Sequence, residues 1–326
     1  MDWKSIASLL FLSIFVISGV SALKVVSTTS VLWDPVRSIG GEKVEAIYVA
    51  DPTICPHLQS DIIPNRIQMQ RDFIRTADLF IAHNGSVDAS YVMPYVSDFM
   101  AANNYGTVNW TTLRNPSMTW NTPEGAKNLA REVAGWLVAA DPGNKSYYEQ
   151  RLAEYISQID AADLSPEERA AIPGQDAVVM IWQEDAARKW LGLDVVSIYA
   201  PEFYQRGQFV PRAVVNDIYN NPEKYRNVRY VIENMQSGEM AKGIEEALRD
   251  NGIDAKRVVF TNFPKSVPGV ESLPDVLRHN KDLVKPRVSP EAPGQGTTAP
   301  TRAPLGLLAL PLAMGAALLI SGRRLH

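Results

Sequence analysis

The chain has 326 residues, of which 21% are charged and 46% are hydrophobic, and its formal net charge at pH 7 is -4. This slightly acidic balance comes without a basic stripe, which argues against a nucleic-acid partner. Cys55 is the only cysteine, so no intramolecular disulfide can form and stability must come from packing.

Residues 1–22 predict a secretory signal peptide. Lys4 precedes an apolar run at residues 6–20, and Val20-Ser21-Ala22 offers small residues for cleavage before Leu23. The mature chain is therefore expected to work outside the cytoplasm. Glycosylation sequons begin at Asn84, Asn109 and Asn144. They matter only in a host that glycosylates exported proteins.

The first half of the mature chain predicts an α/β lobe at residues 23–141. Its predicted strands are residues 23–27, 44–49 and 79–82, and its predicted helices are residues 33–39 and 66–76. This βαβα order indicates a mostly parallel sheet with helices on its faces.

Two longer helical segments follow. The first, at residues 123–140, has Thr122 as its cap and Pro123 at its first position. The second begins at Pro142 and reaches Ala162, a length of roughly 30 Å. Its place between two α/β units predicts a rigid strut, within a linking segment at residues 142–172. A surface helix of one lobe is the alternative.

The second half repeats the alternation over residues 173–285. Its predicted strands are residues 177–181, 194–198, 230–233 and 257–261, and its predicted helices are residues 184–191, 210–219 and 239–251. About 260 residues between the terminal segments are enough for two lobes with their own cores. The expected fold is α/β, with two lobes of mostly parallel sheet joined by one long rigid helix, plus a C-terminal membrane helix.

The C-terminal segments predict an anchor. Residues 286–302 are rich in Pro, Gly, Thr and Ala and indicate a flexible linker. Residues 303–322 carry no charge and are followed by Arg323-Arg324. Such a run just spans a hydrocarbon core of about 30 Å, and the arginines favour the cytoplasmic side. A sorting signal that is cut and replaced by another anchor has the same composition.

One loop holds a histidine in a constrained position. Asp51-Pro52-Thr53-Ile54-Cys55-Pro56-His57 follows a predicted strand, and its prolines restrict the backbone. An imidazole held in this way can bind a metal ion, although a histidine that caps a backbone group is the simpler interpretation.

Several segments, in this order, resemble the metal-binding solute receptors of zinc and manganese ABC importers. They are Val26-Ser27-Thr28-Thr29-Ser30, residues 39–45, residues 51–57, Ala77-Asp78-Leu79, Thr122-Pro123-Glu124-Gly125-Ala126-Lys127, residues 140–149, Ile232-Glu233 and Leu277-Arg278-His279-Asn280. The resemblance covers most of residues 23–283. It implies two α/β lobes joined by one rigid helix, with a metal ion between the lobes held by four side chains, two from each. It also implies an ABC permease as the partner.

The resemblance places the four ligand positions at residues that are mostly altered. His57 matches the first family histidine. Met118 stands where the second histidine is expected, and Glu184 or its neighbour Gln183 takes the place of a His or Glu. Asn262 stands where the family has an Asp before a Pro.

This ligand set weakens the expected affinity for Zn²⁺ or Mn²⁺. It carries at most one negative charge, and the thioether of Met118 is a poor ligand for either ion. Met118, His57 and a Cys55 thiolate would suit Cu⁺, which ranks below the other two. Met118 and Cys55 as plain core residues are the simpler interpretation.

The sequence thus predicts an extracytoplasmic, monomeric solute-binding receptor that delivers a metal ion to an ABC permease. One alternative is a receptor of the same fold for an organic or chelated ligand, in a cleft lined by Trp33, Trp120, Trp182 and Tyr204. The other is a structural surface protein. An enzyme is not expected, because no catalytic triad or Gly-rich phosphate loop is present.

Overall fold

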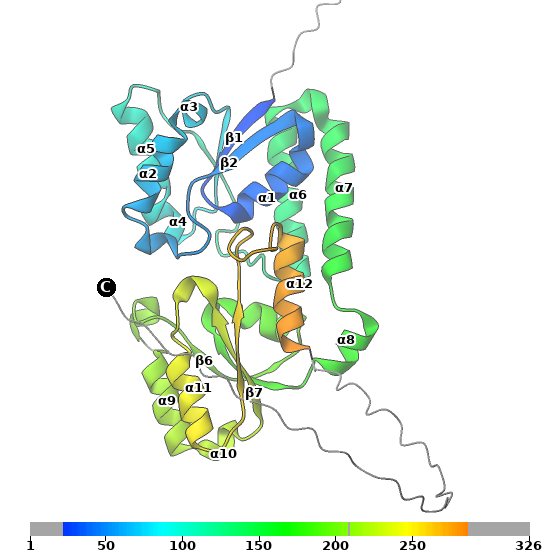
Figure 1. Ribbon diagram of the computed structural model, residues 1–326. Coiled ribbons are helices and arrows are strands. Elements are labelled where there is room, and N and C mark those ends of the chain that lie inside the picture. Colours follow the sequence, from blue (N-terminus) through cyan, green and yellow to red (C-terminus); the bar gives the residue numbers. More distant parts are fainter. Residues whose placement is uncertain (1–21, 208, 286–326) are drawn as a thin grey trace, which may run out of the picture. The chain divides into compact units, whose positions relative to one another are not determined.

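Two four-stranded parallel sheets organise the chain in the computed structural model, which describes residues 22–207 and 209–285 (Figure 1). The first sheet has the order β2-β1-β3-β4 and the second the order β6-β5-β7-β8, with every neighbouring pair parallel. The strands are β1 (Leu23–Ser27), β2 (Val44–Tyr48), β3 (Leu79–Ala82), β4 (Trp110–Thr112), β5 (Asp176–Met180), β6 (Asp194–Tyr199), β7 (Val228–Asn234) and β8 (Lys256–Phe260). Each sheet forms the centre of one α/β lobe.

Helices cover both faces of the first sheet because its central strands are apolar on both sides. Val25 and Ile81 pack with α1 and α6, whereas Val26 and Phe80 pack with α2 and α5 on the opposite face. The helices of this lobe are α1 (Ser30–Gly40), α2 (Ile62–Met69), α3 (Arg71–Ile74), α4 (Ser86–Tyr91), α5 (Met93–Ala102) and α6 (Pro123–Ala140).

The second sheet is covered in the same way. Val178 and Val231 pack with α9 and α11, and Val179 and Ile232 face the cluster that contains α12. The helices that follow α6 in the chain are α7 (Lys145–Ala162), α8 (Pro166–Ala171), α9 (Pro211–Asn220), α10 (Pro222–Tyr225), α11 (Lys242–Asp250) and α12 (Leu273–Val284).

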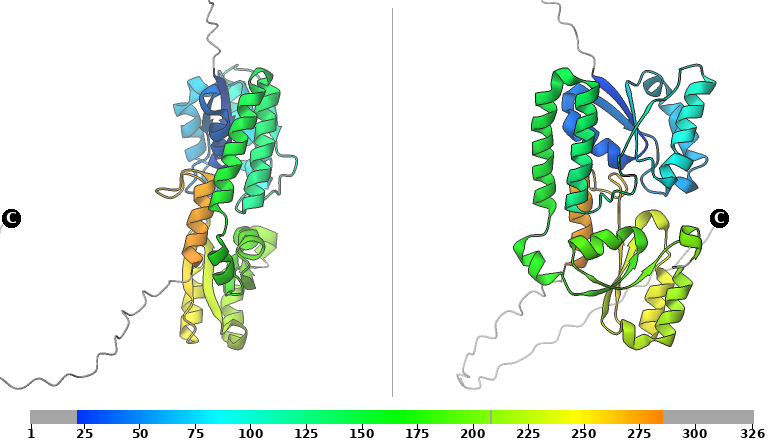
Figure 2. Two further views of the ribbon diagram at one scale, coloured as in Figure 1. Left: turned by 90° about the vertical axis from the view of Figure 1, so that its right-hand side faces the viewer. Right: turned by 180° about the vertical axis from the view of Figure 1, so that it is seen from behind.

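Helix α7 connects the two lobes. It runs beside α6 (Figure 2), and its Tyr155 and Ile159 belong to an apolar cluster that also contains Leu32 of α1 and Leu277 of α12. The cluster is therefore continuous from the first lobe into the second. Arg151 adds two hydrogen bonds from its guanidinium to the carbonyl oxygen of Ser38, at 3.1 and 2.8 Å.

A single buried carboxylate joins α1, α7 and α12. Asp34 of α1 is 2% exposed, and its Oδ2 accepts hydrogen bonds from the Tyr155 hydroxyl at 2.5 Å and from the Leu273 N–H at 2.6 Å. Its Oδ1 accepts a third from the Ser38 hydroxyl at 3.1 Å. Leu273 is the first residue of α12, so the bond also satisfies an N–H group that the helix itself cannot pair.

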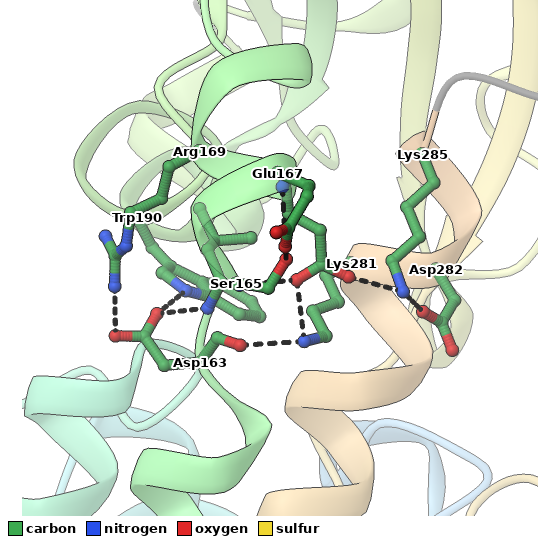
Figure 3. Close-up of polar contacts among 10 residues, drawn as sticks. Asp163, Ser165, Glu167, Arg169, Trp190, Lys281, Asp282 and Lys285 are labelled. Carbon is green, nitrogen blue, oxygen red and sulfur yellow. Dashed lines mark hydrogen bonds and ion pairs between the residues drawn. The ribbon is translucent and has the colours of Figure 1, made fainter. Parts of the chain in front are cut away.

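A polar cluster fixes the C-terminal end of α7 (Figure 3). The Asp163 carboxylate accepts a hydrogen bond from the Trp190 indole N–H at 2.8 Å and pairs with Arg169 at 2.7 Å. The Asp163 carbonyl oxygen accepts a third bond from the Lys281 ammonium group of α12, at 2.7 Å. The residue that ends α7 is thus attached to both the second lobe and α12.

Glu168 in α8 completes this attachment. Ser165 and Glu168 form a capping box at the start of α8, and Glu168 also pairs with Lys281 at 2.9 Å and with Lys285 at 2.5 Å. Burial alone raises the pKa of Glu168, but the hydrogen bonds from the two lysines lower it to about 2. The carboxylate is therefore ionised at neutral pH, and α8 and α12 are tied by a charged contact.

The strands predicted at residues 23–27 and 79–82, and the helix predicted at residues 123–140, are confirmed with those bounds. Two predicted helices are wrong in form. Residues 66–76 are two helices, because Gln70, at φ -107° and ψ 12°, ends α2 and precedes α3. Residues 184–191 contain a π-helical turn at Ala186–Trp190, closed by the hydrogen bond from the Leu191 N–H to the Ala186 carbonyl oxygen.

Within residues 22–207 and 209–285, no helix is both long enough and apolar enough to cross a membrane. The predicted signal peptide up to residue 21, the linker at residues 286–302 and the membrane helix at residues 303–322 lie outside the described residues. The boundaries at residues 141–142 and 172–173 stay predictions.

Replacing Asp34 by Ala is expected to destabilise the fold by about 2–5 kcal/mol, because it leaves the Tyr155 hydroxyl and the Leu273 N–H buried without an acceptor. Urea unfolding at pH 7 measures the change. Asp254→Ala is the control: Asp254 is exposed, and its replacement should stay within about 0.5 kcal/mol of the wild type. Equal effects of the two substitutions would contradict the role given to Asp34.

The pH dependence of Asp34→Asn separates charge from hydrogen bonding. Burial raises the pKa of Asp34 from 3.8 to about 6, against the hydrogen bonds from Tyr155, Leu273 and Ser38, which lower it. The folded chain therefore binds this proton more tightly, and the contribution to stability is complete below pH 3.8 and is lost as the pH rises to about 6. Between pH 4 and 7 the wild type should lose about 3 kcal/mol relative to the variant. A constant difference would contradict the raised pKa.

Candidate binding cleft between the lobes

A cavity of about 640 Å³ lies between the two sheets. Its wall includes residues that directly follow the carboxyl ends of strands in both lobes: Thr29 after β1, His83 after β3, Trp182 after β5, Gln236 after β7 and Asn262 after β8. Ligands of open parallel sheets bind at this end of the strands. The segment before α6 adds Met118, Trp120 and Asn121.

Hydrogen bonds across the cavity join the lobes. The Trp120 indole N–H donates to the Asn262 carbonyl oxygen at 2.8 Å, and the Gln236 amide donates to the Pro52 carbonyl oxygen at 2.9 Å. Both bonds are made by residues of the cavity wall, so the wall itself is part of the contact between the lobes.

The structure brings three of the four predicted metal ligands to this cavity. Met118, Glu184 and Asn262 line it. His57 lies in a short 3-10 turn, Pro56–Leu58, where its ring packs 4.8 Å from the Phe203 ring and 6.2 Å from the Tyr91 ring, measured between centroids. Cys55 and Pro56, beside His57 in the chain, do line the cavity.

The polar groups at these positions are already engaged. The Asn262 Oδ1 accepts hydrogen bonds from the Asn121 and Gln183 side-chain amides at 3.1 and 3.0 Å. Glu184 pairs with Arg188 at 2.9 Å, one helical turn later. Each pairing uses an oxygen that a metal ion would need.

His57 and Cys55 form a close pair, with 2.8 Å between the His57 Nδ1 and the Cys55 Sγ. Burial lowers the pKa of His57. Burial also raises the pKa of the Cys55 thiol, against a hydrogen bond from His57 that lowers it. Both shifts favour the neutral forms, so the pair is a thiol and an imidazole at neutral pH, not the thiolate that a soft metal ion requires.

The donor set fits a zinc or manganese ion poorly. Among the described residues, no group of three or more His, Cys, Asp or Glu side chains is placed to hold a metal ion. Zn²⁺ in proteins takes four imidazole, thiolate or carboxylate ligands, and Mn²⁺ favours carboxylate and imidazole donors. Here one imidazole lies against aromatic rings and one carboxylate is paired with an arginine.

The structure adds polar residues that the sequence analysis did not select: His83, Asp88, Asn121 and Gln236. All four line the cavity and are only 3–5% exposed. For His83 and Gln236 a signal was present, because each follows a buried strand at the edge of the sheet where ligands bind. Asp88, in α4, and Asn121, before α6, gave no such signal.

His83 and Asp88 form the floor of the cavity in the first lobe. The His83 Nε2 lies 2.7 Å from the Thr29 hydroxyl, and burial lowers the pKa of His83 to about 3, so its ring is neutral. The Asp88 Oδ2 accepts hydrogen bonds from the Thr28 hydroxyl at 3.0 Å and from the His83 N–H at 2.7 Å. Burial raises the pKa of Asp88 to about 6, against these hydrogen bonds, which lower it. The carboxyl group is mainly ionised at pH 7.

Known transport proteins are similar to this chain in sequence. It is 22% identical over 307 residues to the metal ABC transporter substrate-binding lipoprotein FimA of Streptococcus parasanguinis, covering 86% of this chain and 98% of FimA. It is 26% identical over 185 residues to the manganese ABC transporter substrate-binding lipoprotein PsaA of Streptococcus pneumoniae, covering 49% of this chain and 59% of PsaA.

Solved structures share the fold. A periplasmic metal binding protein from Candidatus Liberibacter asiaticus superposes with a TM-score of 0.59 at 16% identity, over 80% of this chain and 99% of that one. The periplasmic zinc binding protein TroA from Treponema pallidum gives a TM-score of 0.57 at 14% identity, over 81% and 98% of the two chains.

The family profile described as "Zinc-uptake complex component A periplasmic" matches residues 25–285. This match covers both sheets and α7. The chain therefore belongs to the zinc-uptake complex component A family.

Proposed function

We propose that this protein is an extracytoplasmic solute-binding receptor that captures its cargo in the cavity between the lobes and delivers it to an ABC permease. The observation that carries the proposal is the cavity, built from the carboxyl ends of strands in both sheets of a family member. Relatives named as ABC transporter substrate-binding proteins support the transport role.

A metal ion is the cargo that the names of the relatives suggest, since they include zinc and manganese proteins. We propose that Zn²⁺ or Mn²⁺ binds here through His57 with Met118, Glu184 and Asn262, more weakly than in a site with four charged or imidazole ligands. Cu⁺ ranks below both, because the neutral Cys55 thiol is a poor ligand for it.

Replacing His57 by Ala tests the metal site. The substitution is expected to abolish any shift of the unfolding temperature by Zn²⁺ or Mn²⁺, because it removes the one imidazole of the set, while the fold without metal keeps its stability within about 1 kcal/mol. Elemental analysis of protein purified without chelators, with titrations of each ion, provides the measurement.

His279→Ala is the matched control, since this residue lies in α12 and outside the cavity wall. A metal-dependent shift that survives in His57→Ala would contradict the ligand assignment. A wild-type protein that is metal-free and insensitive to both ions would contradict metal cargo altogether.

We propose that α7 acts as a rigid strut that keeps the lobes at a nearly fixed spacing. Asp34 holds the middle of the helix to α1 and α12, and Asp163 holds its end to the second lobe and α12. Wide hinge closure would break both sets of buried contacts.

Small-angle scattering checks the strut. The radius of gyration should change by less than about 1 Å when a ligand is added, because side chains and loops can rearrange while the helix contacts stay intact. A larger decrease on ligand addition would be the signature of a hinged receptor and would contradict the strut. Asp34→Ala is the informative comparison, since it removes one of the two attachments.

We further propose that residues 1–22 direct export and that residues 303–322, with Arg323-Arg324 behind them, anchor the receptor beside its permease. The full-length chain should remain in the membrane fraction after an alkaline carbonate wash and co-purify with a permease. A chain that ends at Lys285 should be released.

The two readouts of this experiment are independent. Release of the full-length chain by carbonate would contradict the anchor. Anchored protein that never co-purifies with a permease, even after cross-linking, would contradict the receptor role and favour a structural surface protein.

A further inference from the structure

Four buried polar atoms in the cavity wall have no hydrogen-bond partner in the described structure: the His83 Nδ1, the Asp88 Oδ1, the Asn121 Oδ1 and the Gln236 Oε1. Their residues are 3–5% exposed. A buried polar atom that lacks a partner costs roughly 1–3 kcal/mol, so four such atoms around one cavity indicate that something else bonds to them.

The unpaired atoms ask for donors. The Asn121 amide nitrogen already donates toward the Trp182 carbonyl, the Gln183 side chain and the Asn262 side chain, at 3.0–3.1 Å. The Gln236 amide nitrogen donates to the Pro52 carbonyl at 2.9 Å and the Thr261 hydroxyl at 3.2 Å. These bonds fix both amides with their oxygens free. With the Asp88 Oδ1, the cavity presents three acceptors, and only the His83 Nδ1 can serve as either donor or acceptor.

The cavity also lacks a positive charge to balance Asp88. Among the side chains that the structure describes, no lysine or arginine lines the wall, and His83 is neutral. The other two carboxylates of the wall have partners, since Glu184 pairs with Arg188 at 2.9 Å and Asp185 with Lys189 at 2.8 Å. A buried carboxylate without a cation is unfavourable, and a cationic ligand would compensate for it.

Aromatic rings from both sides complete the wall. Trp120 lies 4.7 Å from the His83 ring and 6.3 Å from the Phe263 ring, and Trp182 lies 6.4 Å from Tyr204, all between centroids. Trp120, Trp182, Tyr204 and Phe263 all line the cavity. Such faces attract flat groups and organic cations.

We propose that this cavity binds a small organic cation, an ammonium or amidinium compound whose N–H groups donate to Asp88, Asn121 and Gln236 and whose flat or apolar part lies against Trp120 and Trp182. The proposal rests on the receptor function and names the class of solute that the receptor carries. A cavity of about 640 Å³ falls in the usual size range for such ligands, about 300–1,000 Å³.

A bare metal ion matches these observations less well. One carboxylate oxygen and one neutral imidazole nitrogen are the strong donors among the four unpaired atoms, and the other two are amide oxygens. An ion would fill only a small part of the cavity and would leave the aromatic faces unused. Ordered water could also satisfy the atoms, but it would leave the Asp88 charge without a counter-charge.

Three probes of nearly equal shape test the proposal on the purified full-length protein. Benzamidine is a flat cation with N–H donors, benzamide is a neutral analogue that keeps a donor, and benzoate is an anion without donors. Calorimetric titration at pH 7 in the presence of a chelator is expected to give benzamidine at least about tenfold tighter binding than benzamide, because a charge-assisted hydrogen bond is roughly twice as strong as a neutral one. Benzoate should not bind.

Asp88→Asn should reduce the preference for benzamidine over benzamide to less than about threefold, because it removes the charge and keeps the shape. Asp254→Asn, an exposed aspartate of the second lobe, is the matched control and should leave the preference unchanged. If Asp88→Asn fails to fold, the three probes on the wild type still decide. Equal affinities, tighter benzoate, no benzamidine binding, or displacement of benzamidine by Mn²⁺ alone at micromolar concentration would each overturn the proposal.

This test is separate from that of the receptor role. Benzamidine selectivity without any permease partner would leave the ligand class standing and remove the transport function. A permease complex together with failed benzamidine binding would do the reverse. Mass spectrometry of small molecules released from the purified protein by denaturation should then yield an organic amine or amidine; an anion would count against the proposal.

Discussion

The buried carboxylate of Asp34 is the interaction on which the arrangement of the lobes depends. It accepts from the hydroxyl of Tyr155 in the connecting helix α7 and from the N–H of Leu273 at the start of α12. One side chain of the first lobe thus holds the helix that leaves that lobe and the helix that returns from the second. Because the site is dry and fully hydrogen-bonded, either partner can move only at the cost of an unpaired buried group.

This attachment decides what the cleft can be. With the lobes held by Asp34 at one end and by Asp163 at the other, the carboxyl ends of the two parallel sheets face the same cavity. Direct bonds between the lobes, such as that from Gln236 to the Pro52 carbonyl, form part of its wall. The cavity is therefore largely formed before any ligand arrives, which reduces the entropy lost on binding.

Family membership and ligand chemistry diverge in this protein. The fold follows the family across residues 25–285. Yet Asn262, at a position where the resemblance implies a metal-binding carboxylate, belongs to a network of amides with Asn121 and Gln183. Amides can donate and accept without charge, so they suit an organic solute better than a divalent ion. The remaining unpaired charge, on Asp88, lies in the floor of the first lobe.

The sequence by itself determined the two lobes, because strands such as residues 79–82 and helices such as residues 123–140 carry their own local signals of apolar run, cap and period. It missed β4, whose three residues Trp110–Thr112 are too short to give a period. It also selected Met118, Glu184 and Asn262 for the cleft. Only the tertiary structure decided which polar atoms of the cleft remain free. Whether Asn262 or Asp88 is available depends on partners distant in the sequence, and such pairings leave no local pattern.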